Sequence, residues 1–165
     1  MNIRPYRGAD LSAVARLFTE SVHGLTAGAY EAEQRAAWAP PQPDANHWQK
    51  RLEALETLVA ETGDAIAGFI SFEGSGHIDL LYTAPEYSRR GVATLLYTEG
   101  ESTLARRGVV ELFTEASVVA RPFFECFGFF VTEEQNVAVQ GTSLRRYAMR
   151  KQMVAAQPYQ APGFQ

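Results

Sequence analysis

One stretch decides the fold: His77-Ile78-Asp79-Leu80-Leu81-Tyr82-Thr83, then Ala84-Pro85-Glu86-Tyr87-Ser88, then Arg89-Arg90-Gly91-Val92-Ala93-Thr94. Its first seven residues are mostly apolar or aromatic, which predicts a strand over residues 77–83. Gly91 then opens a helix that we predict over residues 91–107. The first N–H groups of a helix lack partners and carry the positive end of its dipole, so this start predicts a site for phosphate or pyrophosphate.

The residue types around Gly91 suit such an anion. Glycine lets a ligand approach the backbone closely, and Ala93 keeps the next approach point small. Arg89 and Arg90 add positive charge where the anion would lie. A glycine with two arginines is also common at protein surfaces, so this motif alone leaves a plain surface turn open.

Outside this stretch, the hydrophobic pattern predicts further elements on both sides. Strands are expected at residues 2–6, 57–61, 65–73, 109–115, 129–139 and 143–149, and helices after Asp10, within 25–44, after Asp44 and at 120–127. This order predicts an α/β fold with a mixed, mostly antiparallel sheet of six or seven strands and helices on both faces. We expect one domain over residues 1–151 and a flexible or interface-forming tail over 152–165, because the tail is uncharged and contains two prolines.

Composition argues against several classes of function. The 165 residues carry a net charge of −4, which disfavours the many phosphate contacts that nucleic-acid binding needs. One cysteine and three histidines, with no cluster at metal-ligand spacing, predict no metal site. No apolar run is long enough for a membrane helix, and the first residues lack the order of a signal peptide, so we expect a cytoplasmic protein.

Two segments match the pattern of a known family. Ser88-Arg89-Arg90-Gly91-Val92-Ala93, preceded by Leu81-Tyr82-Thr83-Ala84-Pro85, resembles the signature Gln/Arg-x-x-Gly-x-Gly/Ala of the GNAT superfamily of CoA-dependent N-acyltransferases. Ala120-Arg121-Pro122-Phe123-Phe124-Glu125-Cys126-Phe127-Gly128-Phe129 resembles Ala-x-x-Phe-Tyr-x-x-x-Gly-Phe, the family's short helix beside the pantetheine arm. The resemblance covers roughly residues 2–150, and the two segments together are more specific than either alone.

The resemblance implies the GNAT fold and an acetyl-CoA-dependent N-acetyltransferase in which an amine attacks the thioester directly in a ternary complex. The acceptor would be a small-molecule or peptide amine, and the resemblance is compatible with a homodimer through the last hairpin and the tail. The strand at 77–83 would separate from the following strand to admit the pantetheine, with a backbone N–H near Tyr82 facing the oxyanion. The residues implied to bind the coenzyme are Leu81, Tyr82, Thr83, Arg89, Arg90, Gly91, Val92, Ala93, Thr94, Phe123 and Phe124.

Two positions depart from the family pattern. Ser88 stands where glutamine or arginine is preferred, which removes one side-chain contact and leaves the backbone groups in place. Phe124 stands where many members have a tyrosine that protonates the leaving thiolate, and phenylalanine has no proton to donate. A thiol with a pKa of about 8.5 leaves with little protonation, so transfer does not require that tyrosine.

The acceptor amine is an ammonium at pH 7 and needs a base before it attacks. Strand alternation predicts that His77 and Asp79 share one face while Ile78 and Leu80 face the core. His77 has the ordinary pKa best suited to a base, and Asp79 would orient it or hold the substrate cation. Glu115, at the end of the next strand, is the third candidate. The alternatives are a solvated His77 at the start of a strand and a Glu115 that is a plain surface group.

By the same resemblance, residues 25–48 would form the variable wall of the acceptor site. Tyr30, Trp38 and Trp48 would bind a cationic amine by cation–π contact, although Trp48 also fits the core of an amphipathic helix. Cys126 has no histidine nearby in the sequence and is predicted to be a packed or half-exposed thiol. Two other functions stay open: a catalytically weak CoA-binding or sensing protein, which Phe124 favours, and a non-catalytic interaction module.

Overall fold

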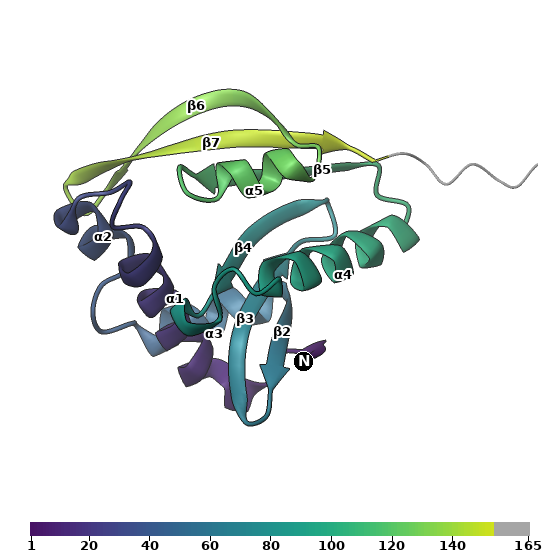
Figure 1. The fold of residues 1–165 in the computed structure, drawn as a ribbon, viewed down its shortest axis with the longest axis horizontal. Coiled ribbons are helices and arrows are strands. Elements are labelled where there is room, and N and C mark those ends of the chain that lie inside the picture. Colours follow the sequence, from purple (N-terminus) through teal and green to yellow (C-terminus); the bar gives the residue numbers. More distant parts are fainter. Residues whose placement is uncertain (154–165) are drawn as a thin grey trace, which may run out of the picture.

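The computed structural model describes residues 1–153 and contains a seven-stranded sheet in the order β1-β2-β3-β4-β5-β7-β6 (Figure 1). The strands are β1 (Asn2–Pro5), β2 (Glu56–Thr62), β3 (Ala65–Phe72), β4 (His77–Thr83), β5 (Glu111–Ser117), β6 (Phe130–Val139) and β7 (Thr142–Gln152). Neighbouring strands are antiparallel except β4 and β5, which run parallel. The predicted mixed, mostly antiparallel sheet is confirmed.

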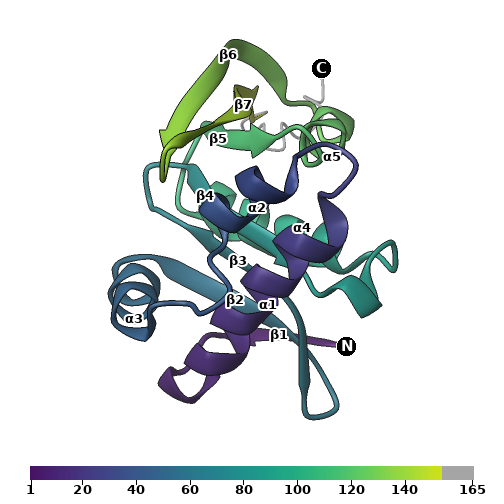
Figure 2. The same ribbon diagram turned by 90° about the vertical axis from the view of Figure 1, so that its left-hand side faces the viewer.

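Helices cover both faces of this sheet, as predicted (Figures 1 and 2). The helices are α1 (Leu11–Leu25), α2 (Ala32–Trp38), α3 (Ala45–Ala54), α4 (Val92–Arg106) and α5 (Arg121–Cys126). The first hydrophobic core joins α1 and α3 to one face, and the second joins α4 and α5 to the other. α2 lies against β7. The β6–β7 hairpin arches over α5 at the far end of the sheet (Figure 1).

Local sequence signals set the starts of two helices in different ways. The Asp44 carboxylate accepts hydrogen bonds from the N–H groups of Asn46 and His47 at 3.0 and 3.2 Å, which confirms the predicted cap of α3. Asp10 does not cap α1 with its side chain. Its carboxylate instead accepts a hydrogen bond from the Arg7 N–H at 2.8 Å, in the short 3₁₀ turn that precedes the helix.

A β-bulge interrupts β4, so its side chains do not alternate between the two faces of the sheet as predicted. Ile78 is opposite Phe72 and Leu80 is opposite Ser71, so Asp79 is an extra residue in this strand. Ile78 and Leu80 are both 3% exposed, as expected for core positions, but they enter different cores. Ile78 packs in the cluster that contains α4, whereas Leu80 packs in the cluster that contains α1. The prediction that both share one face is wrong because the extra residue reverses the side-chain direction.

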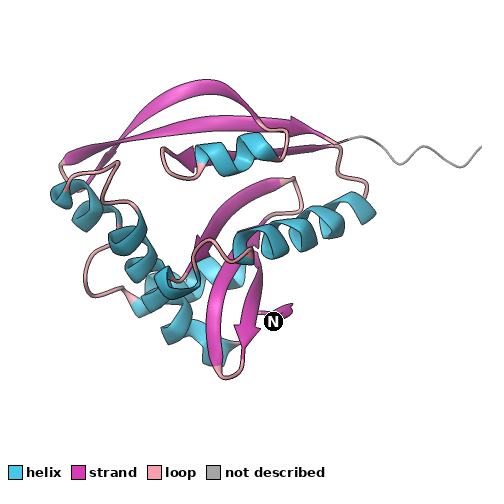
Figure 3. Ribbon diagram, in the orientation of Figure 1, coloured by secondary structure: helices cyan, strands magenta, loops and turns pink. Residues whose placement is uncertain are grey.

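The parallel pair β4 and β5 is short. Its register consists of two pairs, His77 with Phe113 and Ile78 with Thr114. Gly76 permits this close approach, since a Cβ atom there would lie 2.2 Å from a backbone oxygen of β5. Beyond Ile78 the two strands diverge, as their arrows show in Figure 3. The predicted separation of the strand at 77–83 from the next one is therefore present.

The described chain ends just after β7. Gln152 closes this strand, and the Met153 N–H donates a hydrogen bond to the Val110 carbonyl oxygen at 2.8 Å. The rest of the predicted tail, residues 154–165, lies outside the described residues. Among residues 1–153 no helix is both long and apolar enough to cross a membrane.

Candidate active site

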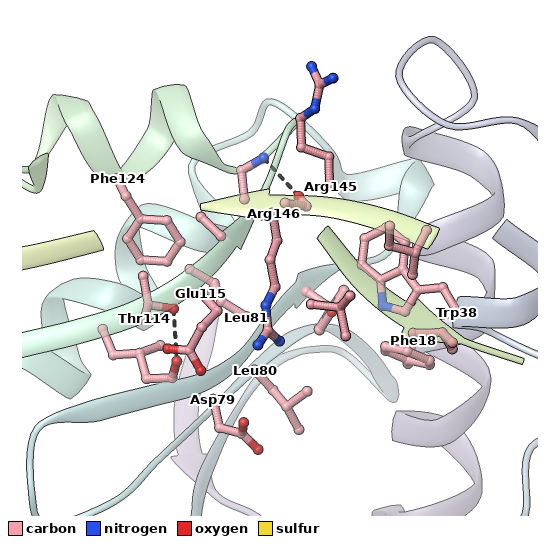
Figure 4. A pocket seen from close by; sticks show the side chains of 18 of the residues that line it. Phe18, Trp38, Asp79, Leu80, Leu81, Thr114, Glu115, Phe124, Arg145 and Arg146 are labelled. Atoms are coloured by element: carbon pink, nitrogen blue, oxygen red, sulfur yellow. Dashed lines mark hydrogen bonds between the residues drawn. The ribbon is translucent and has the colours of Figure 1, made fainter. Parts of the chain in front are cut away.

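The divergence of β4 and β5 leaves a pocket of about 280 Å³ between them (Figure 4). Its charged lining residues are Asp79 of β4, Glu115 of β5, Arg51 of α3 and the adjacent Arg145 and Arg146 of β7, and the Arg145 side chain points away from the cavity. Aromatic and aliphatic side chains from α1, α2, α5 and the β6–β7 hairpin form the rest of the wall. Four elements that are distant in sequence thus place two carboxylates and two guanidinium groups around one cavity.

His77 and Glu115, which the sequence offers as separate candidates, form a pair in the structure. Nε2 of His77 lies 3.0 Å from Oε1 of Glu115 and 3.1 Å from its Oε2. Nδ1 of His77 lies 3.3 Å from the Glu73 carboxylate, and its ring stacks on Phe113 with 4.9 Å between the centroids. Glu115 lines the pocket, whereas His77 lies behind it with its side chain 15% exposed. The carboxylate is therefore the member of the pair that faces a ligand.

This pairing changes the protonation of both groups. The hydrogen bond with Glu115 is the main cause that raises the pKa of His77 to about 8, against the opposing effect of burial. The same hydrogen bond holds the pKa of Glu115 below its usual value. At pH 7 the pair therefore carries a proton on the imidazole and a negative charge on the carboxylate.

Asp79 does not orient His77, contrary to one of the roles that the sequence allows it. Its Oδ2 lies 3.2 Å from both Nε and Nη2 of Arg51, which reaches it from α3. The Arg51 guanidinium also lies over the Trp48 ring, 5.6 Å from its centroid. Asp79 thus lines the pocket as half of an ion pair, and the partner of His77 is Glu115.

The start of α4 has the open backbone that the sequence predicts. Gly91 precedes the helix with φ of 80°, and Arg89 has φ of 59°, a left-handed conformation that is uncommon for a residue with a side chain. The N–H groups of residues 89–94 find no acceptor within residues 1–153. Arg89, Arg90 and Gly91 are exposed, and a Cβ atom at Gly91 would meet nothing within 4 Å. This combination of free donors, positive charge and open space is able to bind an anion.

β4 presents backbone groups to the pocket along its divergent half. The Ala84 N–H donates a hydrogen bond to the Ala67 carbonyl oxygen at 2.9 Å. This bond shows which backbone groups near the end of β4 point toward β3. Because these groups alternate along a strand, Tyr82 also pairs with β3, whereas the N–H and C=O groups of Leu81 and Thr83 point to the pocket side. The donors near Tyr82 that face the pocket therefore belong to its two neighbours.

α5 places a phenylalanine, and no hydroxyl, at the edge of the pocket. Phe124 is 3% exposed, lines the pocket and packs on Phe129 with 5.0 Å between the ring centroids. Phe123 is partly buried and packs edge-on to Phe124 at 5.4 Å. Cys126 is an exposed free thiol at the end of this helix, so it is less covered than predicted.

Two of the three aromatic residues predicted for the acceptor wall reach the pocket. Tyr30 and Trp38 both line it, and their rings pack at 5.4 Å. Trp48 is 4% exposed in the core beside Phe18, which confirms the core alternative. The Tyr30 hydroxyl donates to the Arg145 carbonyl oxygen at 2.6 Å and accepts from the Val118 N–H at 2.9 Å, so it ties β7 to the residue that follows β5.

The sequence patterns do not single out Arg51 or Arg146. Arg146 is half-buried between Leu144 and Tyr147, which are both buried. A basic residue in the middle of a strand that is otherwise half apolar is the signal that could have identified it. In Figure 4 its side chain points from β7 into the pocket, whereas Arg145 points out of it.

Comparison with known proteins agrees with this geometry. Residues 26–152 match the Acetyltransferase (GNAT) domain. YafP of Escherichia coli (strain K12), described as an uncharacterised N-acetyltransferase, is 33% identical over 153 residues, which are 91% of this chain and 95% of that protein.

Two solved structures have the same fold. The crystal structure of a GCN5-related N-acetyltransferase from Rhodopseudomonas palustris has a TM-score of 0.88 at 34% identity, over 92% of this chain and 95% of that one. A GNAT phosphinothricin acetyltransferase from Sinorhizobium meliloti, solved with acetyl-CoA, has a TM-score of 0.70 at 17% identity, over 96% and 92% of the two chains. The chain belongs to the GNAT family of acetyl-CoA-dependent N-acetyltransferases.

Proposed function

We propose that the protein transfers an acetyl group from acetyl-CoA to a primary amine, which attacks the thioester directly in a ternary complex. The observation that carries this proposal is the pocket between β4 and β5, which is lined by Glu115 and by Leu81, whose backbone N–H and C=O groups point away from β3. Acetyl-CoA supplies the acyl group in the activated form of a thioester. The chain supplies the binding groups, the orientation and the acceptor for a proton.

The start of α4 fits the diphosphate of the coenzyme. Its free N–H groups, the open space at Gly91 and the exposed Arg89 and Arg90 are what a compact anion requires. The free edge of Leu81 and Thr83 leads from this anion site into the pocket and would pair with amides of the pantetheine. The residues that we propose for coenzyme binding are Leu81, Tyr82, Thr83, Arg89, Arg90, Gly91, Val92, Ala93, Thr94, Phe123 and Phe124.

We assign the acceptor side of the reaction to the pair of His77 and Glu115. Glu115 faces the pocket and attracts the ammonium form of the acceptor. While His77 is protonated it lowers the basicity of this carboxylate, and loss of that proton near pH 8 makes the pair a better proton acceptor. Glu115 is thus the group that touches the acceptor, His77 is its positioning residue, and Asp79 adds negative charge to the same wall.

A catalytically weak CoA-binding protein is the second candidate, and Phe124 favours it. This side chain lines the pocket at the position where a hydroxyl would protonate the leaving thiolate, and it cannot do so. Such a protein would bind the coenzyme through the same groups of α4 and β4. It would not release CoA thiol when an amine is added.

Two measurements separate these functions. Isothermal titration with acetyl-CoA tests the coenzyme site, and release of CoA thiol in the presence of a panel of amines tests transfer. We expect Glu115→Gln to keep the affinity for acetyl-CoA and to lower the rate of transfer on the order of 100-fold, as for loss of a general base. Binding without thiol release from any amine would support the sensing protein, and absence of binding would contradict both functions.

A further inference from the structure

Arg146 brings an unsatisfied cation into the pocket. Within residues 1–153 its one hydrogen bond is from Nε to Oε1 of Gln135 at 2.8 Å, and no carboxylate lies within ion-pair distance of it. The two terminal nitrogens of the guanidinium therefore keep their donors free, and Figure 4 shows them inside the pocket. A planar fork of free N–H donors matches a carboxylate better than any neutral group.

The neighbouring arginines do not share this property. Arg51 is held by Asp79 at 3.2 Å, and Arg145 points out of the pocket and pairs with Glu134 at 3.1 Å. Arg146 is therefore the pocket guanidinium whose charge has no partner among the described residues. Its charge also contributes to the lowered pKa of Glu115, which places the two groups within electrostatic reach of each other.

The pocket thus offers one group for each end of a zwitterion. Glu115 accounts for an ammonium, and Arg146, whose side chain enters the pocket from β7, accounts for an anion. A polyamine would leave Arg146 facing a second positive charge, which the site would reject. An acceptor with an amine and a carboxylate a few bonds apart would satisfy both groups.

Part of the remaining wall is apolar, beside Thr114, Ser117 and the ion pair of Asp79 and Arg51. Val137, Val139 and Leu144 of the β6–β7 hairpin and Trp38 of α2 line this part of the pocket. The cavity of about 280 Å³ is just below the range of roughly 300–1,000 Å³ typical of small-molecule sites. An acceptor that fills it is a small molecule with an apolar side chain.

We propose that the acceptor is a free amino acid with an apolar side chain, held by its carboxylate on Arg146 and by its amine at Glu115. This inference rests on the proposed acetyltransferase function and adds its substrate class. The ammonium loses one proton to the pair of Glu115 and His77, and the nitrogen lone pair then forms the N–C bond as the C–S bond breaks. The nitrogen loses a second proton as the neutral amide forms, which balances the proton that the thiolate takes up. The products are the N-acetyl amino acid and CoA, whose thiolate takes up a proton.

The test compares acceptors that differ only in the carboxylate. Leucine and phenylalanine are each measured against their amides and their decarboxylated amines, by CoA release and by calorimetric binding to the protein saturated with CoA. We expect the free amino acids to have kcat/KM values on the order of 100-fold above those of their amides. Arg146→Gln should remove this preference, because it removes the guanidinium that binds the carboxylate. The ratio of the two kcat/KM values within one variant is independent of how much of that variant is folded.

Arg145→Gln is the matched control, since it removes an adjacent arginine whose guanidinium points away from the cavity and pairs with Glu134. It should keep the preference, and Arg146→Lys should restore part of it. Equal turnover of amides and free amino acids, or failure of both amino acids to bind the CoA complex, would overturn the acceptor class and leave the acetyltransferase function standing. If the protein without substitutions does not bind acetyl-CoA, the proposed function itself is overturned.

Discussion

Nε2 of His77 and Oε1 of Glu115 lie 3.0 Å apart across the short parallel pair of β4 and β5. These residues are separated by 38 positions, and their contact exists because the two strands pair only at this end before they diverge. The carboxylate faces the pocket while the imidazole is stacked on Phe113. The two therefore act as one titrating unit at the base of the site.

This unit predicts the pH dependence of the enzyme. His77 is charged below pH 8, so the pair is a poor proton acceptor there, and kcat/KM should rise with an apparent pKa of about 8. Glu115→Gln removes the main cause of the raised pKa, so the pKa of His77 should fall toward its ordinary value of about 6.5. The first value is read from a pH–rate profile and the second from NMR titration of the imidazole. An imidazole that titrates near 6.5 in the unaltered protein would contradict the pairing.

The anion site at α4 is tested by substituting glycines at the two ends of that helix. Gly91 and Gly108 have φ of 80° and 84°, and a Cβ atom at either meets nothing within 4 Å. Gly91→Glu and Gly108→Glu therefore carry a similar backbone strain of about 1 kcal/mol in stability. Only Gly91→Glu should weaken acetyl-CoA binding, by more than 10-fold, because it puts a negative charge at the diphosphate site. Equal calorimetric affinities of the two variants would contradict the assignment.

The ion pair of Arg4 and Asp10 predicts a pH-dependent contribution to stability. The side chains are 12% and 11% exposed, with Nη1 of Arg4 2.8 Å from Oδ2 of Asp10. The hydrogen bond from Arg4 is the main cause that lowers the pKa of Asp10. Asp10→Asn should lower the free energy of unfolding by about 3 kcal/mol at pH 7, because it leaves Arg4 with only Glu61 as a partner.

The sign of this effect follows from the lowered pKa of Asp10. Its contribution is present above the unfolded pKa of about 3.9 and is lost as the pH falls through the lower folded value. Denaturant melts of Asp10→Asn and the unaltered protein should therefore differ by a constant amount at pH 5–8 and converge below pH 4. A difference that does not decrease as the pH falls below 4 would show that the pair is not its origin.

The Tyr30 hydroxyl predicts a coupling between stability and the acceptor site. Tyr30→Phe leaves the Val118 N–H without its acceptor and the Arg145 carbonyl oxygen without its donor. We expect a loss of about 1–3 kcal/mol in the free energy of unfolding. We also expect a higher KM for the acceptor, because Arg145 precedes Arg146 on β7. An unchanged KM would show that the hydroxyl only stabilises the fold.

Much of the fold was predictable from local sequence. The strand from His77 to Thr83, the helix after Gly91 and the cap at Asp44 each depend on residues within a few positions of one another. Strand and helix periodicities and capping are short-range effects, which is why these elements agree with the structure. The cytoplasmic location, the homodimer, the boundary at residue 151 and the roles of the coenzyme-binding residues stay predictions.

The tertiary structure decided how the reactive side chains meet. The bulge at Asp79 reverses the alternation of β4, the end of the β4–β5 pairing brings His77 to Glu115, and β7 carries Arg146 into the pocket. By itself the sequence determined the start of a helix at Gly91, where we propose the anion site, because a helix start needs only adjacent residues. The charges around the acceptor pocket depend on the register between strands far apart in the chain, and long-range packing sets that register.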